Sequence, residues 1–146
     1  MTTLLLVRHG ETVDNVRQIM QGQTQGKLTP NGIEQARALA AELKDTPIDV
    51  FVSSDLKRAF DTCVILAAAH GVAPDAIVQT KLLRERDWGS FTGRYIPDLK
   101  DAVWTDDIES LDALRARAAS FLQFVRENYN GKTVLEIGRA SCRERV

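Results

Sequence analysis

Two short apolar runs, each ending abruptly in polar residues, constrain the fold of this chain more than any other feature. The first covers residues 3–7 and leads into Arg8-His9-Gly10, and the second covers residues 50–52 and leads into Ser53-Ser54-Asp55. Continuous apolar runs of this length are typical of strands that are buried on both faces of a parallel sheet. Because open sheets of this kind bind ligands beyond the carboxyl ends of their strands, we expect both polar segments to lie at one ligand-binding rim.

Helical patterns alternate with these runs. Apolar residues recur at helical spacing after Thr29-Pro30, after Ser54-Asp55 and over residues 110–129. Thr29 is expected to cap the first helix, with Pro30 in its first turn, and Ser54 or Asp55 is expected to cap the second. This alternation predicts an α/β fold with a mainly parallel sheet. The remaining expected elements are a long loop over residues 14–26, an edge strand over residues 76–78 and a strand over residues 133–137.

Composition narrows the class of protein. The 146 residues are 44% apolar and 27% charged, which suits one packed domain and excludes intrinsic disorder. A net charge of −1 provides no general field for nucleic acid or an anionic membrane surface, and no apolar run approaches the roughly 20 residues of a membrane span. Cys63 and Cys142 make neither a disulfide framework nor a zinc site. We therefore expect a soluble, cytoplasmic domain with neither nucleic acid nor a membrane as partner.

Four motifs follow one another along the chain. They are Leu5-Leu6-Val7-Arg8-His9-Gly10-Glu11-Thr12 with Asn15, Leu28-Thr29 with Gly32 and Gln35-Ala36, Ser53-Ser54-Asp55-Leu56-Lys57-Arg58-Ala59 with Thr62, and Leu83-Arg84-Glu85 with Gly89 and Gly93. Together they resemble the signature of the histidine phosphatase superfamily, also called the phosphoglycerate mutase-like family. The resemblance covers nearly all of residues 3–135, and it implies a three-layer sandwich with helices on both faces of the sheet.

The resemblance also implies phosphoryl transfer through a phosphorylated histidine. His9 can be neutral near pH 7, so one ring nitrogen has a lone pair for attack on phosphorus. Arg8 and Arg58 match the family's phosphate-binding arginines, and guanidinium groups suit that task because they make bidentate, charged contacts to phosphate oxygens. Glu85 is expected to protonate the leaving oxygen and then to accept a proton from water. No acidic or histidine cluster has metal-ligand spacing, so we expect the arginines to replace metal ions and no cofactor to be needed.

Further residues are expected to complete the phosphate site. The Asn15 amide, and backbone N–H groups near Gly10 and in the Gln21-Gly22 loop, are candidate donors. Each candidate also has an ordinary structural interpretation. Arg58 by itself would be a solvated helix residue, and Glu85 lies in a charge run over residues 84–87 that is typical of exposed surface.

The end of the chain departs from the family pattern. The family has a second histidine in a Ser-His-Gly turn after a late strand, whereas Arg139 occupies that position here. Residues 139–146 contain three Arg and one Glu, unlike the slightly acidic remainder. We therefore expect an incomplete histidine phosphatase-like domain over residues 1–135, lacking the C-terminal elements, and a non-native or out-of-frame tail over residues 136–146. An uninterrupted genomic reading frame through Val146 would refute this.

The expected function is hydrolysis of a small phosphorylated metabolite, a phosphomonoester, through a phosphohistidine intermediate. One alternative is a phosphoglycerate-type mutase, which returns the phosphoryl group to substrate and must keep water away from the intermediate. The missing C-terminal region argues for the hydrolase, because that region would help to cover the site. A catalytically inactive phospholigand-binding module is a second alternative, supported by the missing second histidine. The third is an incomplete fragment that does not fold alone.

Overall fold

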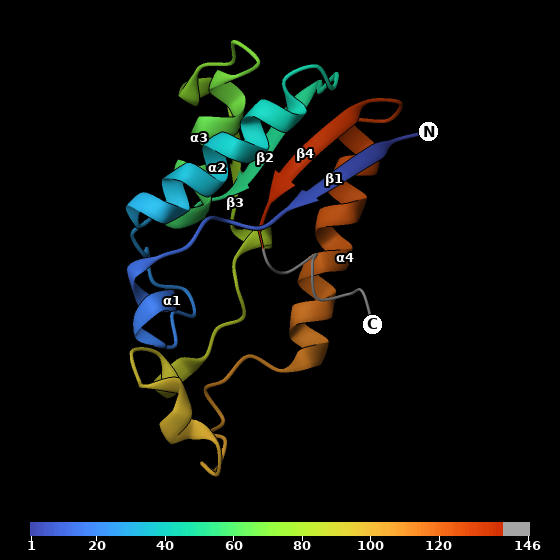
Figure 1. Ribbon diagram of the computed structural model, residues 1–146. Helices are drawn as coiled ribbons and strands as arrows, with labels where there is room; N and C mark the ends of the chain where they lie inside the picture. The colour runs from blue at the N-terminus through green and yellow to red at the C-terminus, as the bar shows by residue number, and fades with distance from the viewer. Residues whose placement is uncertain (139–146) are drawn as a thin grey trace.

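A four-stranded parallel sheet forms the centre of the structure, a computed structural model that describes residues 1–138 (Figure 1). Every pair of neighbouring strands is parallel, with Val7 opposite Ile137 and Val50 opposite Val134. The predicted α/β fold with a parallel sheet is therefore confirmed. The strands are β1 (Thr3–Val7), β2 (Val50–Ser54), β3 (Val78–Thr80) and β4 (Thr133–Ile137), and their order across the sheet is β1-β4-β2-β3.

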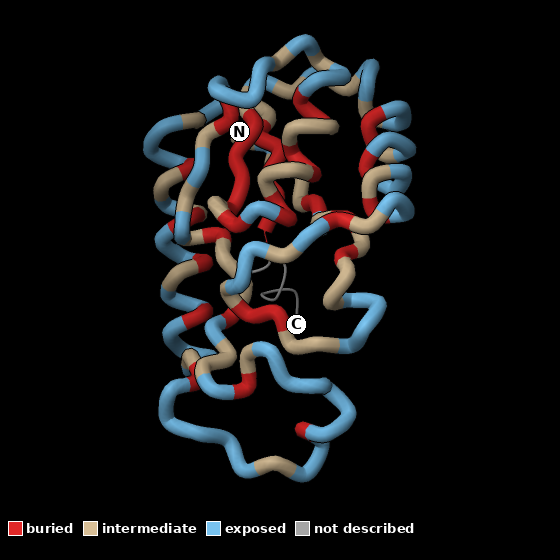
Figure 2. Tube along the Cα trace, turned by 90° about the vertical axis from the view of Figure 1, so that its left-hand side faces the viewer, coloured by how far each residue is buried: buried red, intermediate tan, exposed pale blue. Residues whose placement is uncertain are grey.

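Helices cover both faces of the sheet, as the three-layer prediction requires (Figure 1). On one face the buried side chains of Cys63 and Leu66 pack with Leu135 of the sheet. On the other face Phe121 packs with Val134. The connection between β3 and the helix that begins at Leu111 is mostly exposed (Figure 2). The three long helices are α2 (Pro30–Leu43) and α3 (Lys57–Ala68) on the first face and α4 (Leu111–Asn128) on the second.

A short helix overlaps the start of residues 14–26, which are expected to form a long loop. This helix, α1 (Val13–Arg17), begins with a capping box. The Thr12 hydroxyl accepts from the Asn15 N–H at 3.1 Å, and the Asn15 side chain accepts from the Thr12 N–H at 2.9 Å. Five residues are too few for an apolar period, so the Thr-x-x-Asn spacing was the only available signal.

Three other local expectations differ from the structure. The N-cap of α3 is Leu56, with no side-chain cap, because the Asp55 carboxylate pairs instead with Arg84. Residues Pro74–Ala76 form a 3₁₀ turn, so β3 starts at Val78, where the predicted edge strand ends. β1 is only partly buried, because it lies at an edge of the described sheet.

Residues on both sides of the predicted end of the domain belong to one strand. β4 continues through Glu136 and Ile137, and both side chains are fully buried. Arg139, Cys142 and the rest of the predicted tail lie outside the described residues. The assignment of residues 136–146 to a foreign tail stays a prediction. Within residues 1–138, no helix has the length and apolar character needed to cross a membrane.

Cys63 lies in the core between α3 and the sheet, and burial raises the pKa of its thiol to about 12. Because the thiolate is the reactive form, we expect Cys63 to resist alkylation at pH 8 in the folded protein and to react after denaturation. Mass spectrometry of the peptide that contains Cys63 measures this protection. Rapid labelling without denaturant would contradict the packing of α3 on the sheet.

Candidate active site

A pocket of about 200 Å³ lies beyond the carboxyl ends of β1 and β2. Six of the seven predicted site residues line it, and Arg8 is the exception, because its side chain is exposed and lies outside the lining. An adjoining small hollow is lined in part by His9, Arg58, Glu85 and Gly138, so the end of β4 borders the same site. The pocket lining comprises His9, Asn15, Ile19, Met20, Gln21, Gly22, Arg58, Glu85, Trp88 and Ile96.

His9 has a fixed tautomer. Its Nδ1 lies 2.7 Å from the carbonyl oxygen of Gly10. A carbonyl oxygen only accepts hydrogen bonds, so Nδ1 carries the proton and donates it. In the neutral ring the lone pair is then on Nε2, which is the arrangement that a nucleophilic histidine needs.

The loop that carries His9 is held against α2 and α3. A Cβ atom on Gly10 would lie 2.4 Å from the carbonyl oxygen of Gly32, so only glycine permits this approach to the start of α2. The Gly10 N–H donates to the Thr62 hydroxyl at 3.1 Å, and that hydroxyl donates to the carbonyl of Arg58 at 2.8 Å. The Gly10 N–H was a candidate phosphate donor, but it is used here to attach the loop to α3.

Arg58 lies in the first turn of α3 and is only 2% exposed, so its interpretation as a solvated helix residue is wrong. Its guanidinium donates to the carbonyl oxygens of Thr24 at 2.5 Å and Gly22 at 2.7 Å. Its backbone N–H donates to the Gln25 carbonyl at 2.9 Å. Arg58 therefore holds the loop after α1 in place and also brings a buried positive charge to the pocket.

That loop carries Gln21 and Gly22. Gly22 has a φ of +52°, in the left-handed region that favours glycine. The Gln21 amide oxygen accepts from the Thr12 hydroxyl at 2.8 Å. Asn15 uses its amide oxygen in the cap of α1, which leaves its amide nitrogen as the donor for the pocket that it lines. The structure thus brings all three residues to the pocket beside His9.

Glu85 is half-buried, and one of its carboxylate oxygens accepts from the Arg86 N–H at 2.8 Å. Its backbone carbonyl accepts from the Gln23 side chain at 3.3 Å and from Arg117 at 3.2 Å. Glu85 is therefore not part of a freely solvated charge run. Its position depends on contacts from the loop after α1 and from α4.

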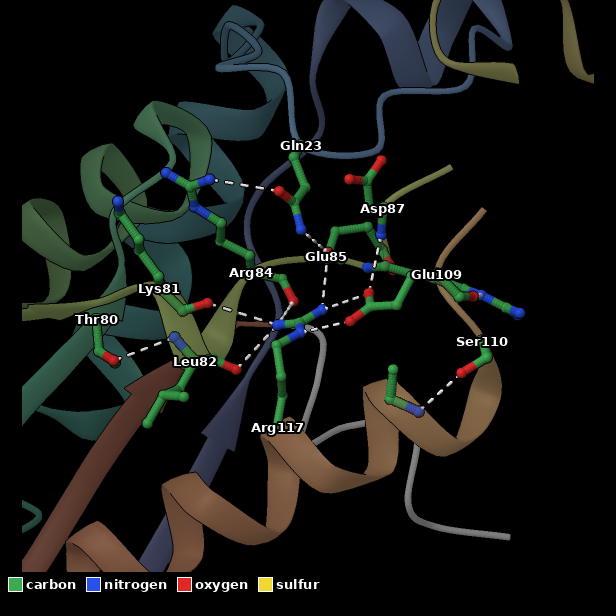
Figure 3. A network of polar contacts seen from close by, with 12 residues as sticks. Gln23, Thr80, Lys81, Leu82, Arg84, Glu85, Asp87, Glu109, Ser110 and Arg117 are labelled. Atoms are coloured by element: carbon green, nitrogen blue, oxygen red, sulfur yellow. Dashed lines mark hydrogen bonds and ion pairs between the residues drawn. The ribbon is translucent and has the colours of Figure 1, made fainter. Parts of the chain in front are cut away.

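A polar network around Arg117 of α4 fixes the segment that contains Glu85 (Figure 3). The Arg117 guanidinium makes a two-pronged contact with the Glu109 carboxylate at 2.7 and 2.8 Å. It also donates to the carbonyls of Leu82 at 3.1 Å and Arg84 at 3.0 Å. Sequence analysis did not identify Arg117, because nothing in the pattern of α4 distinguishes it from the exposed Arg115 on the same helix.

We expect Arg117→Met to destabilise the fold by about 2–4 kcal/mol, because it removes the charged partner of the Glu109 carboxylate and the donor to several partly buried carbonyls. Arg115→Met is the matched control and is expected to change stability by less than about 0.5 kcal/mol, since Arg115 is exposed. Urea unfolding measures both variants. Equal stabilities would contradict the role of the network.

The same network predicts a dependence on pH. Burial alone raises the pKa of Glu109, but hydrogen bonds from Arg117 and from the Asp87 N–H outweigh it and hold that pKa below its usual value of 4.5. A carboxyl with a lowered pKa stabilises the folded state above its unfolded pKa and loses that contribution as the pH falls. The difference between the Arg117 and Arg115 variants should therefore shrink below about pH 4.5.

A histidine with a defined tautomer, a buried arginine and a half-buried glutamate thus meet at the carboxyl edge of a parallel α/β sheet. This combination is typical of proteins that hold a phosphate group beside a nucleophilic imidazole. The sequence profile of the histidine phosphatase superfamily (branch 1) matches residues 4–138, and the chain belongs to this family. Within residues 1–138, no cluster of His, Cys, Asp or Glu is arranged to hold a metal ion.

Several named proteins are similar to this chain over most of its length. A metal-independent phosphoserine phosphatase of Arabidopsis thaliana is 33% identical over 93% of this chain and 63% of its own length. The uncharacterized phosphatase PhoE of Bacillus subtilis is 34% identical over 97% of this chain and 74% of its own length. A probable phosphoglycerate mutase, GpmB of Enterobacter sp., is 39% identical over 69% of this chain and 46% of its own length. The chain thus spans between about half and three quarters of these relatives.

Solved structures confirm the fold. YhfR of Bacillus stearothermophilus superposes with a TM-score of 0.84 at 29% identity, over 94% of this chain and 74% of that one. A phosphoserine phosphatase variant from Entamoeba histolytica, in complex with phosphoserine, superposes with a TM-score of 0.79 at 26% identity, over 97% of this chain and 78% of that one. The phosphoglycerate mutase-like fold predicted from the motifs is therefore correct.

Proposed function

We propose that this protein hydrolyses small phosphomonoesters through a phosphohistidine intermediate on His9. The hydrogen bond from His9 Nδ1 to the Gly10 carbonyl, at 2.7 Å, carries this proposal, because it leaves the lone pair on Nε2 in a pocket shared with Arg58. Two relatives that are named phosphatases, together with the family to which the chain belongs, support the proposal.

The first half of the reaction transfers the phosphoryl group to the enzyme. Nε2 of His9 attacks phosphorus, and the P–N bond forms as the bond to the ester oxygen breaks. Glu85, protonated at this stage, gives its proton to the departing alcohol. The buried guanidinium of Arg58 offsets the charge of the phosphate, which otherwise repels a nucleophile.

The second half returns the enzyme to its starting state. Water attacks phosphorus, the Glu85 carboxylate accepts a proton from it, and the P–N bond breaks. The products are inorganic phosphate and a neutral His9 with its lone pair restored. Asn15, Gln21 and Gly22 are proposed to bind the phosphate oxygens from the loop side of the pocket. Arg8 is proposed to reach the phosphate from the exposed side, since it directly precedes His9.

A mutase is the second candidate, favoured by the probable phosphoglycerate mutase among the relatives. The two activities differ in the acceptor of the phosphoryl group. We expect the chain, incubated with a phosphomonoester and a small alcohol, to release mainly inorganic phosphate. A phosphorylated alcohol as the main product would assign the mutase reaction. Retention of phosphorylated ligand without any turnover would assign a binding module.

We also propose that the protein acts in the cytoplasm, without nucleic acid or a membrane as partner. The net charge of −1 supports the absence of these two partners, since it provides no general attraction to anionic polymers or membrane surfaces. Fractionation of cells that express the protein tests the proposal. Recovery with membranes or with nucleic acid would contradict it.

A further inference from the structure

One wall of the active-site pocket is apolar. Four large side chains form it: Ile19, Met20, Trp88 and Ile96. Ile96 is 44% exposed although it is apolar, so the wall continues to the mouth of the pocket. The polar residues of the lining are those proposed above to bind the phosphate or to take part in its transfer. The wall is therefore left for the alcohol portion of a substrate.

Backbone hydrogen bonds build this wall from two distant segments. The Met20 N–H donates to the Arg94 carbonyl at 2.9 Å, and the Gly93 N–H donates to the Met20 carbonyl at 2.8 Å. The Ile96 N–H donates to the Gln18 carbonyl at 2.8 Å. This short antiparallel pairing, in which Ile19 lies opposite Tyr95, brings Met20 and Ile96 into the lining of the same pocket.

Contacts with Arg86 and Trp104 hold the Trp88 ring in place. The guanidinium carbon of Arg86 lies 4.9 Å from the Trp88 ring centroid and 5.0 Å from that of Trp104. The two indole rings meet edge to face at 5.4 Å. Arg86 is itself buried, and its Nε donates to the Glu109 carbonyl at 2.7 Å. Trp88 therefore offers the pocket a preorganised apolar surface.

The charges around the pocket disfavour an acidic alcohol portion. Among the described lining residues, Arg58 is the single permanent cation, and the phosphate site uses it. A carboxylate against the apolar wall would lose its hydration without gaining a cationic partner from the described lining.

Resting on the proposed function, we infer that the substrate is a phosphomonoester of an apolar alcohol, with an alkyl or aryl group against Trp88, Met20 and Ile96. Carboxylated esters such as phosphoserine or phosphoglycerate fit this pocket poorly. The preferred substrate of this chain then differs from that of its Arabidopsis thaliana relative, which is named a phosphoserine phosphatase.

Alkylphosphonates test this inference by binding alone, because they have no ester bond to hydrolyse. Titration calorimetry of the 146-residue chain compares butylphosphonate, hexylphosphonate and the carboxylated 3-phosphonopropionate. Each buried methylene contributes about fourfold in affinity, so hexylphosphonate should bind up to about sixteenfold more tightly than butylphosphonate. Butylphosphonate should bind at least about tenfold more tightly than 3-phosphonopropionate, which places a carboxylate where butyl places carbon.

Variants connect the preference to the wall. Trp88→Ala is expected to reduce the advantage of hexylphosphonate over butylphosphonate, and so is Ile96→Ala, which alters a half-exposed site and should leave the fold intact. Val103→Ala is the matched control, because Val103 is 87% exposed and does not line the pocket. Equal affinity for both chain lengths, tighter binding of 3-phosphonopropionate, or no binding of any phosphonate would each overturn the inference. If His9 does not accept the phosphoryl group, the dependence of phosphonate affinity on chain length is unchanged. The experiment therefore distinguishes failure of this inference from failure of the proposed function.

Discussion

Replacement of His9 by alanine is expected to lower the turnover of a phosphomonoester by at least about a thousandfold. The variant has no ring nitrogen to accept the phosphoryl group, and the direct attack of water on the substrate is far slower. Release of inorganic phosphate under saturating substrate measures the loss. Because the side chain contributes little to the core, the variant should retain the circular dichroism spectrum of the parent.

His70→Ala is the matched control for this experiment. The His70 ring nitrogens lie 3.3 Å from the Leu66 carbonyl and 3.0 Å from the Thr46 carbonyl, and the ring is not part of the pocket lining. Because His70 lies outside the pocket, we expect this variant to keep turnover per folded molecule within about threefold of the parent, even if the loss of its contacts lowers stability. A His9→Ala protein that hydrolyses esters as fast as the His70→Ala protein would remove the basis of the mechanism.

Arg58→Ala is expected to lower kcat/KM by about 10²–10³-fold and also to reduce stability. Two effects combine, because the guanidinium both supplies charge to the phosphate site and holds the carbonyls of Thr24 and Gly22. Arg58→Lys separates them. It restores the charge without the planar fork, so it should recover only part of the activity.

Activity of the Arg58 variants is measured per folded molecule, with the folded fraction taken from urea unfolding. Arg37→Ala is the control, because Arg37 lies on the exposed face of α2 and pairs only with Glu34 among its described neighbours. A parental kcat/KM in Arg58→Ala would show that the phosphate is bound elsewhere.

The elements that position the site follow from local patterns, and these could be predicted. Two apolar runs that end in polar residues indicated β1 and β2, and the predicted rim is where His9 and Arg58 meet. Thr29 caps α2 as expected, and its hydroxyl accepts from the Gly32 N–H at 2.9 Å. These features depend on residues that are close in the sequence, so a single chain is enough to identify them.

The features that sequence analysis missed depend on contacts between distant segments. Arg117 and Arg115 cannot be told apart in the sequence. Only the approach of residues 82–85 to α4 places Arg117 at the centre of the polar network. The apolar wall likewise joins Met20 to Ile96 through pairing across more than seventy residues. The phosphate contact of Arg8, which its motif predicts, stays a prediction, because its side chain is exposed and lies outside the pocket lining.

Covalent trapping tests the central step most directly. The chain is mixed with a phosphomonoester labelled with radioactive phosphorus, quenched with alkali within milliseconds, and digested. The mechanism predicts an acid-labile label on the peptide that contains His9, and none on the same peptide from His9→Ala. Turnover without any trapped label, or a label on a different residue, would contradict phosphoryl transfer through this imidazole.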